Sequence, residues 1–375
     1  MSGDAVPSAG RPLHVVVAPD SFKGSADAAD IARAMAAGWR DARPADHVTV
    51  LPQADGGEGT MAALAASTGG ARWHAVSDVC GPDHRPVTAR WLELPGSLGV
   101  VELAESSGLP LMASLDPRRA TSRGLGQVIR AAVGHGAQRL VVGLGGSAST
   151  DGGVGMLREL GLVLLDDGGR PVTIDDVTGL AAVARVDVGA LLAAPPGGVE
   201  VLTDTLAPLY GPDGAAHTFG AQKGADAETR DALDRALRRI ADAIGPPLGA
   251  DASEPGTGAA GGVGFGLRAW GARLVPGADR INHLTGLTDA IPTADVVVTG
   301  EGRFDSTSAT GKLVGTIVRR CTAHGVRTLV VAGDLAVAPP DLGVSLVAVA
   351  GSVEAALAEP LTHARSAVRA AAASI

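Results

Sequence analysis

Three glycine-rich segments that also carry acidic residues are the parts of this 375-residue chain best suited to chemistry. They span residues 54–60, 145–153 and 299–306. Glycine lets bare backbone N–H groups approach an anion closely, and a nearby carboxylate can hold a divalent cation or accept a proton. Because phosphoryl transfer depends mainly on positioning and charge stabilisation, this combination predicts a phosphoryl-transfer site.

The segment 145–153 is the strongest candidate for an anion-binding loop. Its hydroxyl groups add donors to the backbone amides, and the residues expected to contact phosphate are Gly145, Gly146, Ser147, Ser149 and Thr150. Asp151 would bring excess negative charge to such a loop, so it either meets a metal ion or caps the next helix. The segment is not a Walker A motif, because G-x-x-x-x-G-K-[ST] does not occur in the sequence.

Two lysines fall at predicted helix N-termini, where a positive charge opposes the helix dipole. Lys23 follows the first predicted strand, directly after Asp20 and Ser21, and Lys312 lies in the first turn of a helix predicted over residues 311–323. An anionic ligand at either place would remove the conflict, and open α/β sheets bind ligands at this edge. The alternative for each is an ordinary turn with a solvated lysine.

Composition and charge exclude several classes of protein. Hydrophobic residues make up 46% and aromatic residues only 2%, so a large core must consist of alanine, valine and leucine. A net charge of −9 without a basic stripe argues against a nucleic-acid partner. No apolar run reaches the ~18 residues of a membrane span, and the polar N-terminus lacks a signal peptide, so a cytoplasmic location is expected.

Cysteine and histidine patterns argue against zinc chemistry. Neither Cys80 nor Cys321 has metal-type spacing, and no His-Glu-x-x-His motif or Cys/His cluster occurs. Cys321 falls on the apolar face of its predicted helix and is expected in the core.

Both ends of the chain alternate predicted strands and helices. A strand over residues 14–18 precedes a helix that Ser25 should cap, with Ile31, Met35 and Trp39 on its apolar face. The C-terminal third predicts strands over residues 295–299, 327–332 and 346–350 and helices over 311–323 and 353–373. The middle predicts short strands between residues 73 and 101, further strands at 139–142 and 200–202, and a helix at 227–244.

This alternation predicts an α/β fold of two α/β domains. A Rossmann-like, doubly wound domain is expected from both chain ends, residues 1–69 plus 289–375. A second α/β domain, residues 70–288, is expected as an insertion. The cleft between the domains is the expected active site.

An ordered series of motifs resembles the type I glycerate kinases from about residue 13 to the end. The matching segments, in order, are Ala18–Ser25, Ala54–Thr60, Thr121–Gly124, Gly145–Gly153, Gly220–Ala225, Gly258–Gly262, Thr299–Ser306 and Gly311-Lys312. One departure falls at Asp204-Thr205-Leu206-Ala207-Pro208-Leu209, where the family often has an asparagine.

The resemblance implies transfer of the γ-phosphoryl group of ATP to D-glycerate, with Mg²⁺, giving 2-phosphoglycerate and ADP. The expected partners are these small molecules, and the protein is expected to be a monomer or a homodimer. We assign catalysis to Lys23, Asp204 and Asp151, and phosphate binding to Gly145, Gly146, Ser147, Ser149, Thr150 and Lys312. Substrate contacts are assigned to Asp20, Ser21, Arg123 and Arg303, and metal binding to Asp55, Glu301 and Asp305.

Two other functions remain compatible with the sequence. A dinucleotide-dependent dehydrogenase would use Gly143-x-Gly145-x-x-Ala148 after the strand at 139–142, with Asp166 after a strand at 162–165 as the acidic residue of the fingerprint. A catalytically idle regulator would keep the nucleotide-binding loops without turnover.

Overall fold

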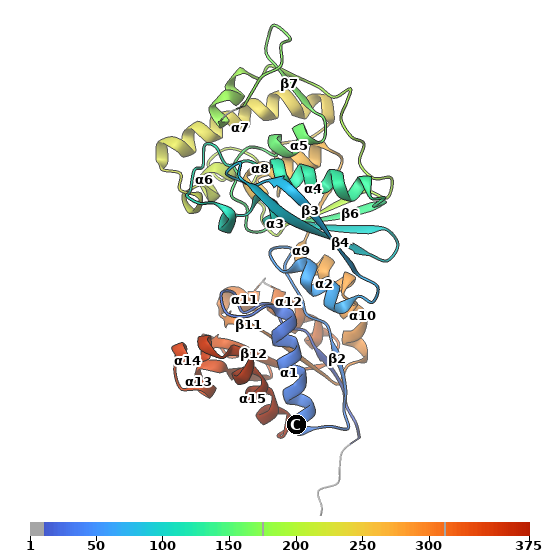
Figure 1. The fold of residues 1–375 in the computed structure, drawn as a ribbon. Coiled ribbons are helices and arrows are strands. Elements are labelled where there is room, and N and C mark those ends of the chain that lie inside the picture. The colour runs from blue at the N-terminus through green and yellow to red at the C-terminus, as the bar shows by residue number, and fades with distance from the viewer. Residues whose placement is uncertain (1–10, 175, 311–312) are drawn as a thin grey trace, which may run out of the picture. The chain divides into compact units, whose positions relative to one another are not determined.

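The structure is a computed structural model that describes residues 11–174, 176–310 and 313–375 (Figure 1). The chain divides into two compact units. The first contains residues up to Gln53, 62–67 and 282–375, and the second contains 54–61 and 68–281. Both are built from helices and largely parallel sheets, which confirms the α/β prediction. The domain boundaries 1–69 plus 289–375 and 70–288 stay a prediction, as does the cleft, because compactness does not show which segments fold independently.

The first unit is built on a five-stranded parallel sheet in the order β13-β12-β11-β1-β2. Its strands are β1 (His14–Val17), β2 (His47–Val50), β11 (Val296–Phe304), β12 (Arg327–Leu335) and β13 (Leu342–Ser345). From β1 the chain steps outward to β2, whereas from β11 it steps the opposite way to β12 and β13. The strand order therefore reverses between β1 and β11, and such a switch point is where doubly wound sheets bind ligands.

Helices cover both faces of this sheet. They are α1 (Ala28–Ala42), α10 (Leu287–Ala290), α11 (Ser306–Thr310), α12 (Leu313–Ala323), α13 (Leu346–Ala350), α14 (Val353–Ala358) and α15 (Pro360–Ala372). Helices α1 and α15 pack side by side (Figure 1) in a core that includes Val15 and Val17, and α12 packs with Val330. Ile31, Met35 and Trp39 are fully buried, as their spacing predicted.

Two local predictions in the first unit were wrong. Asp27, not Ser25, caps α1, because the Asp27 carboxylate accepts the Asp30 N–H at 2.7 Å while the Ser25 hydroxyl donates to the Phe22 carbonyl. Residues 346–350 form a helix instead of a strand. The strand β13 ends one residue earlier at Ser345, whose Oγ accepts the Ala348 N–H and so begins α13.

The second unit contains a six-stranded sheet in the order β10-β9-β6-β5-β4-β3. Strands β3 (Arg72–Cys80), β4 (Pro86–Leu94) and β5 (Leu98–Glu102) are antiparallel. Strands β6 (Arg139–Gly143), β9 (Val199–Leu202) and β10 (Arg273–Val275) continue the sheet parallel to β5. Consecutive valines of β5 and β6 are inaccessible on both faces, as buried parallel strands require.

The helices of the second unit are α3 (Ala104–Ser107), α4 (Arg123–Gly134), α5 (Val154–Glu159), α6 (Ala215–Phe219), α7 (Ala227–Leu248) and α8 (Ala259–Ala269). Helices α2 (Thr60–Ser67) and α9 (Gly277–Leu284) contribute residues to both units. The predicted helix at 227–244 is α7, with Leu233, Leu237, Ile240 and Ile244 buried. None of the helices in the described ranges has the length and apolar character needed to cross a membrane.

Strand β7 (Val163–Leu165) does not join the main sheet of the second unit. It pairs antiparallel with β8 (Arg185–Asp187) in a separate two-stranded sheet. A dinucleotide fingerprint needs the strand before its acidic residue to lie parallel to the strand before its glycine loop. Because β7 is not next to β6, Asp166 lacks the context that the dehydrogenase interpretation requires.

Candidate functional site

The first acidic glycine segment crosses the carboxyl ends of the parallel strands in the second unit. A Cβ atom on Gly143, the last residue of β6, would lie 2.6 Å from the Gly56 carbonyl oxygen, and one on Gly56 would lie 2.6 Å from Leu202 of β9. Gly277 approaches the Asp55 carbonyl so closely that a Cβ would lie 2.0 Å from it. The glycines therefore let this loop lie directly on the strand ends, which places Asp55 there.

Glu102, at the end of β5, anchors the same loop. Its carboxylate accepts the Gly59 N–H at 3.2 Å and the Met61 N–H at 2.5 Å. Burial raises the pKa of Glu102 to about 7, although these two hydrogen bonds favour the charged form. The contacts assign Glu102 to holding the loop, since it does not line the nearby cavity.

A cavity of about 420 Å³ opens at this edge of the sheet. We call it the glycine-loop pocket. Its polar lining comes from three loops that follow strands and from the turn after α6. The lining residues that carry the argument below are Asp55, Gly145, Gly146, Ser147, Asp204 and Lys223.

Lys223 is the buried cation of the glycine-loop pocket. Its Nζ donates to Ser147 Oγ at 2.9 Å and to the Ser149 carbonyl oxygen at 2.5 Å. Burial lowers the pKa of Lys223 to about 7, and the charge of Asp151 only partly opposes this. Because no carboxylate in the described part of the chain is bonded to Lys223, its ammonium group at the glycine loop is suited to receive an anion.

Lys223 was missing from the site residues assigned by sequence, yet composition holds a signal for it. Only three of the 31 lysine and arginine residues are lysines, and each one is next to a glycine: Lys23, Lys223 and Lys312. Arginine replaces lysine readily on solvated surfaces but not where a compact ammonium group must fit. Of the two lysines that the structure describes, Lys223 is buried, as expected where the smaller cation is required, whereas Lys23 is exposed.

Asp204 and Asp55 bring two carboxylates to the same pocket. Asp204 Oδ1 accepts the N–H of Gly277, the first residue of α9, at 2.8 Å. Burial raises the pKa of Asp204, and the charges of Asp55 and Asp279 add to the increase. Asp55 Oδ1 accepts the Gly57 N–H at 2.9 Å. These groups offer hard oxygen ligands for Mg²⁺ or a base with raised proton affinity.

The segment 145–153 has two structural roles. Gly145, Gly146 and Ser147 line the glycine-loop pocket, whereas Ser149 and Thr150 do not, and both of their hydroxyls are buried without a hydrogen-bond partner among the described residues. The later part of the segment 145–153 instead packs against a second glycine-rich stretch, residues 258–262. A Cβ on Gly261 would lie 2.0 Å from the Ser149 carbonyl oxygen, so the close approach of the two loops excludes side chains there.

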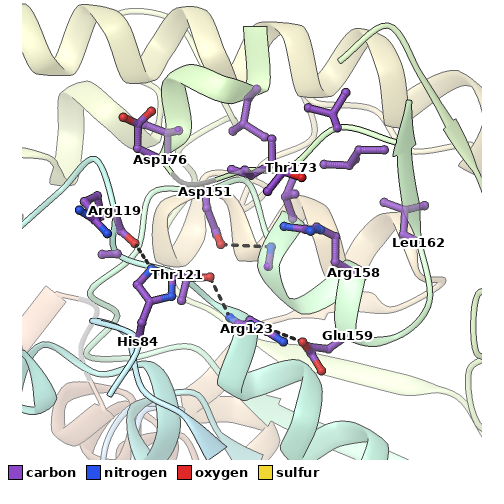
Figure 2. Close-up of a pocket in the computed structure, with 18 of the residues that line it drawn as sticks. His84, Arg119, Thr121, Arg123, Asp151, Arg158, Glu159, Leu162, Thr173 and Asp176 are labelled. Carbon is purple, nitrogen blue, oxygen red and sulfur yellow. Dashed lines mark hydrogen bonds and ion pairs between the residues drawn. The ribbon is translucent and has the colours of Figure 1, made fainter. Parts of the chain in front are cut away.

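A second cavity of the same unit, about 590 Å³, holds two other predicted residues, Arg123 and Asp151 (Figure 2). We call it the arginine pocket, because Arg118, Arg119, Arg123 and Arg158 line it. Asp151 is buried, and its carboxylate accepts the N–H groups of Ser122, Gly153 and Gly155 and the Ser122 hydroxyl. Arg123 is ion-paired with Glu159.

These contacts favour the capping interpretation of Asp151. Ser122 immediately precedes α4 and Gly155 lies in the first turn of α5, so one carboxylate joins the N-termini of two helices. The structure does not bring Arg123 into the pocket that holds Asp204. The catalytic role of Asp151 and the substrate role of Arg123 stay predictions. The alternatives are that Asp151 caps two helices and that Arg123 is held in its ion pair with Glu159.

The other predicted residues that the structure describes belong to the first unit, where they lie on the segment after β1, on β11 and directly after β11, the two strands that flank the switch point. The Asp20 N–H donates to the Gly300 carbonyl, which joins the segment after β1 to β11, and Asp20 Oδ1 accepts the Ser21 N–H. A Cβ on Gly302, the neighbour of Glu301 within β11, would lie 3.7 Å from the backbone nitrogen of Lys23, so the segment after β1 runs close to this part of β11.

Two residues of the segment 299–306 already have local partners. Asp305 Oδ1 accepts the Thr307 and Ser308 N–H groups at the start of α11, and Arg303 lies 3.9 Å from Asp334. Lys312 lies outside the described residues. The metal set Asp55, Glu301 and Asp305 draws on both units, so it stays a prediction.

Comparisons with known proteins point in one direction. The family model described as the glycerate kinase family matches residues 15–375. A glycerate kinase of Bacillus subtilis is 37% identical over 329 residues, covering 86% of this chain and 85% of that protein. A glycerate 2-kinase of Escherichia coli is 38% identical over 307 residues, covering 80% of each.

A solved structure agrees with these sequence matches. A crystal structure from Salmonella typhimurium LT2, assigned as glycerate kinase 2, superposes with a TM-score of 0.87 at 35% identity. It covers 97% of this chain and 98% of that one. The similarity therefore extends over both units.

Proposed function

The chain belongs to the glycerate kinase family, and we propose that this kinase transfers the γ-phosphoryl group of ATP to D-glycerate, giving 2-phosphoglycerate and ADP. The observation that carries the proposal is Lys223, a buried ammonium group whose hydrogen bonds to the described residues go to Ser147 Oγ and the Ser149 carbonyl at the glycine loop. Burial destabilises the charged form of this lysine, and a nearby anion stabilises that form. The phosphate groups of ATP would supply such an anion.

The phosphate groups of ATP bind in this proposal at Gly145, Gly146 and Ser147, with Lys223 beneath them. Gly146 has a positive φ of 73°, where a side chain would be strained and would also meet Glu58. Bare amides in such a loop form an anion-binding concavity. The ammonium group then neutralises charge that builds on the transferring group.

Asp204 accepts the proton of the attacking glycerate hydroxyl. The hydroxyl oxygen forms the new bond to the γ-phosphorus, the bond from that phosphorus to the ADP oxygen breaks, and the proton goes to the carboxylate. Since Oδ1 already accepts the Gly277 N–H, the proton goes to Oδ2. The raised pKa of Asp204 supports this role, because it strengthens the carboxylate as a base.

Mg²⁺ fits the carboxylates of the glycine-loop pocket. Asp55 is the ligand that we propose there, with Glu301 and Asp305 retained from the sequence as further candidates. Oxygen donors suit this hard cation, and when bound it supplies charge neutralisation on the phosphate oxygens. Lys23 and Lys312 would add positive charge, and Arg303 would pair with the glycerate carboxylate.

The proposal is tested by incubating the protein with ATP, Mg²⁺ and D-glycerate and identifying the product by phosphorus NMR. We expect 2-phosphoglycerate and ADP in equal amounts from the parent protein and a loss of roughly 10²-fold or more in rate from Lys223→Met. Formation of 3-phosphoglycerate would correct the position of transfer. Stabilisation by Mg-ATP without any phosphorylated product would instead identify the nucleotide-binding regulator.

A further inference from the structure

Two histidines and a glutamate from distant parts of the chain meet at the edge of the second unit. They are His74 on β3, Glu93 on β4 and His135, which follows α4. One ring nitrogen of each histidine and one oxygen of Glu93 all lie within 4.8 Å of one another. None of the three lines the glycine-loop pocket or the arginine pocket.

The register of β3 and β4 creates the first half of this cluster. His74 pairs with Trp91 and Arg72 pairs with Glu93, so His74 and Glu93 are diagonal neighbours on one face of the sheet. His74 Nε2 lies 2.9 Å from Glu93 Oε2. The His74 ring stacks on Trp91 at a centroid distance of 4.2 Å and an angle of 12°, which fixes its orientation.

The end of α4 supplies the third group. His135 is the C-cap residue of this helix, and its ring centroid lies 4.3 Å from that of His74 and 5.6 Å from that of Trp91. The C-terminus of a helix carries partial negative charge, which favours a cation beside it. His135 therefore brings both a ligand atom and a favourable field to the cluster.

We propose that His74, Glu93 and His135 bind a divalent transition-metal ion, with Zn²⁺ as the best match. Two imidazole nitrogens and one carboxylate oxygen are a typical three-residue zinc set that leaves a fourth position for water. Arg72 bonds both Glu93 oxygens, at 2.7 and 3.3 Å, and so orients the carboxylate from outside, as second partners of metal ligands do.

The three ligand atoms, which lie within 4.8 Å of one another, have to come closer to complete the site. Tetrahedral zinc with bonds of about 2.0–2.1 Å needs ligand atoms about 3.3 Å apart. His74 and Glu93 are already closer than this, and the exposed His135 ring can move toward them. The ion would tie the edge strand β3 to the end of α4, so its binding would stabilise the second unit.

The experiment is a calorimetric titration of tag-free protein with Zn²⁺, together with its melting temperature with and without the ion. The parent should bind one equivalent at this site and melt at a higher temperature with zinc. His135→Ala and Glu93→Gln should each weaken binding by roughly tenfold or more. The matched control is His324→Ala, because His324 is also an exposed histidine directly after a helix, α12.

Four outcomes decide the proposal. Unchanged binding in His324→Ala together with loss in His135→Ala supports it. Absence of stoichiometric binding by the parent, equal affinity in His135→Ala, or equal loss in His324→Ala would overturn it. Since His135 is exposed, its variant should melt at the parent temperature without zinc, which separates lost ligation from lost folding. Quenching of Trp91 fluorescence by Cu²⁺, absent in His74→Ala, gives a second readout.

Discussion

The two pockets of the second unit treat their charged groups in opposite ways. In the arginine pocket, Asp151 is bonded by backbone N–H groups of two helix starts and Arg123 is paired with Glu159. In the glycine-loop pocket, Lys223 is fully buried and no carboxylate of the described residues is bonded to it, while the exposed Asp204 lies near the like charge of Asp55. In the arginine pocket the charges of Asp151 and Arg123 are compensated by their partners. In the glycine-loop pocket the burial of Lys223 costs free energy, which a bound anion would offset.

This difference shows what separates a structural charge from a functional one. A carboxylate in a glycine-rich segment resembles a catalytic group in the sequence, but its bonds decide its role. Perturbed proton affinities are enriched at functional sites, although Glu102 shows that a structural anchor can have one as well. On that criterion we propose the glycine-loop pocket as the reactive one.

The largest effect is expected from Lys223→Met. Met matches the length of the stem but carries no charge, so the phosphate groups lose their buried cation and kcat/KM should fall roughly 10²- to 10³-fold. Steady-state kinetics with ATP and D-glycerate, alongside circular dichroism to confirm folding, provide the measurement. If kcat/KM of Lys223→Met stayed within about tenfold of the parent value, the anion site would lie elsewhere.

Asp204→Asn should reduce kcat about 10²-fold, because an amide cannot accept the hydroxyl proton. The raised pKa also predicts the pH profile. Activity of the parent falls as the pH is lowered through the folded pKa of Asp204, at a higher pH than for an ordinary aspartate. Rates measured across this range should show that acidic limb in the parent and not in the variant; a limb that persists belongs to another group.

Asp151→Asn tests the arginine pocket, and we expect it to lower the stability of the protein and not its activity. The substitution removes a charged acceptor that joins α4 and α5, at a cost of about 1.5–3 kcal/mol in unfolding free energy. Urea denaturation measures this cost. The kcat per folded molecule should change by less than about threefold, and a fall comparable to that of Asp204→Asn would restore Asp151 as a catalytic residue.

Much of the fold was predictable because periodicity and strand order depend on local sequence. The apolar stripe of Ile31, Met35 and Trp39 identified α1 correctly, and buried valine runs identified β1, β6 and β11, whereas the similar run at 346–350 is a helix. Helix ends were less certain, since Ser25 and Asp27 are both good caps and only the local backbone decides between them.

The site was harder to predict because burial and long-range contacts are not visible in a sequence. The sequence left Asp151 open between capping and catalysis, and its hydrogen bonds define the capping alternative. Lys223 was overlooked because nothing in Gln222-Lys223-Gly224 shows that its side chain is buried. The three ligands near Trp91 lie 19 and 42 residues apart along the chain, so no contiguous motif exists for His74, Glu93 and His135.

A smaller, proton-linked effect should distinguish Lys223 from any surface lysine. With a pKa of about 7 in the free protein, Lys223 is mostly neutral at pH 8 and charged below pH 6. A bound phosphate raises this pKa, so ADP binding should take up as much as about one proton at pH 8 and almost none at pH 6. Binding heats in buffers of different ionisation enthalpy measure the uptake, and Lys223→Met should abolish it.

The smallest effect is expected from Arg158→Ala. This exposed side chain lines the arginine pocket and makes no ion pair with a described residue, so neither folding nor the proposed reaction depends on it. Its kcat/KM should stay within about threefold of the parent, and its unfolding free energy within about 0.5 kcal/mol. A tenfold rise in the KM for ATP would show that the arginine pocket binds the nucleotide. The balanced charges of Asp151 and Arg123 would then frame the substrate site, and the assignment of the two pockets would be reversed.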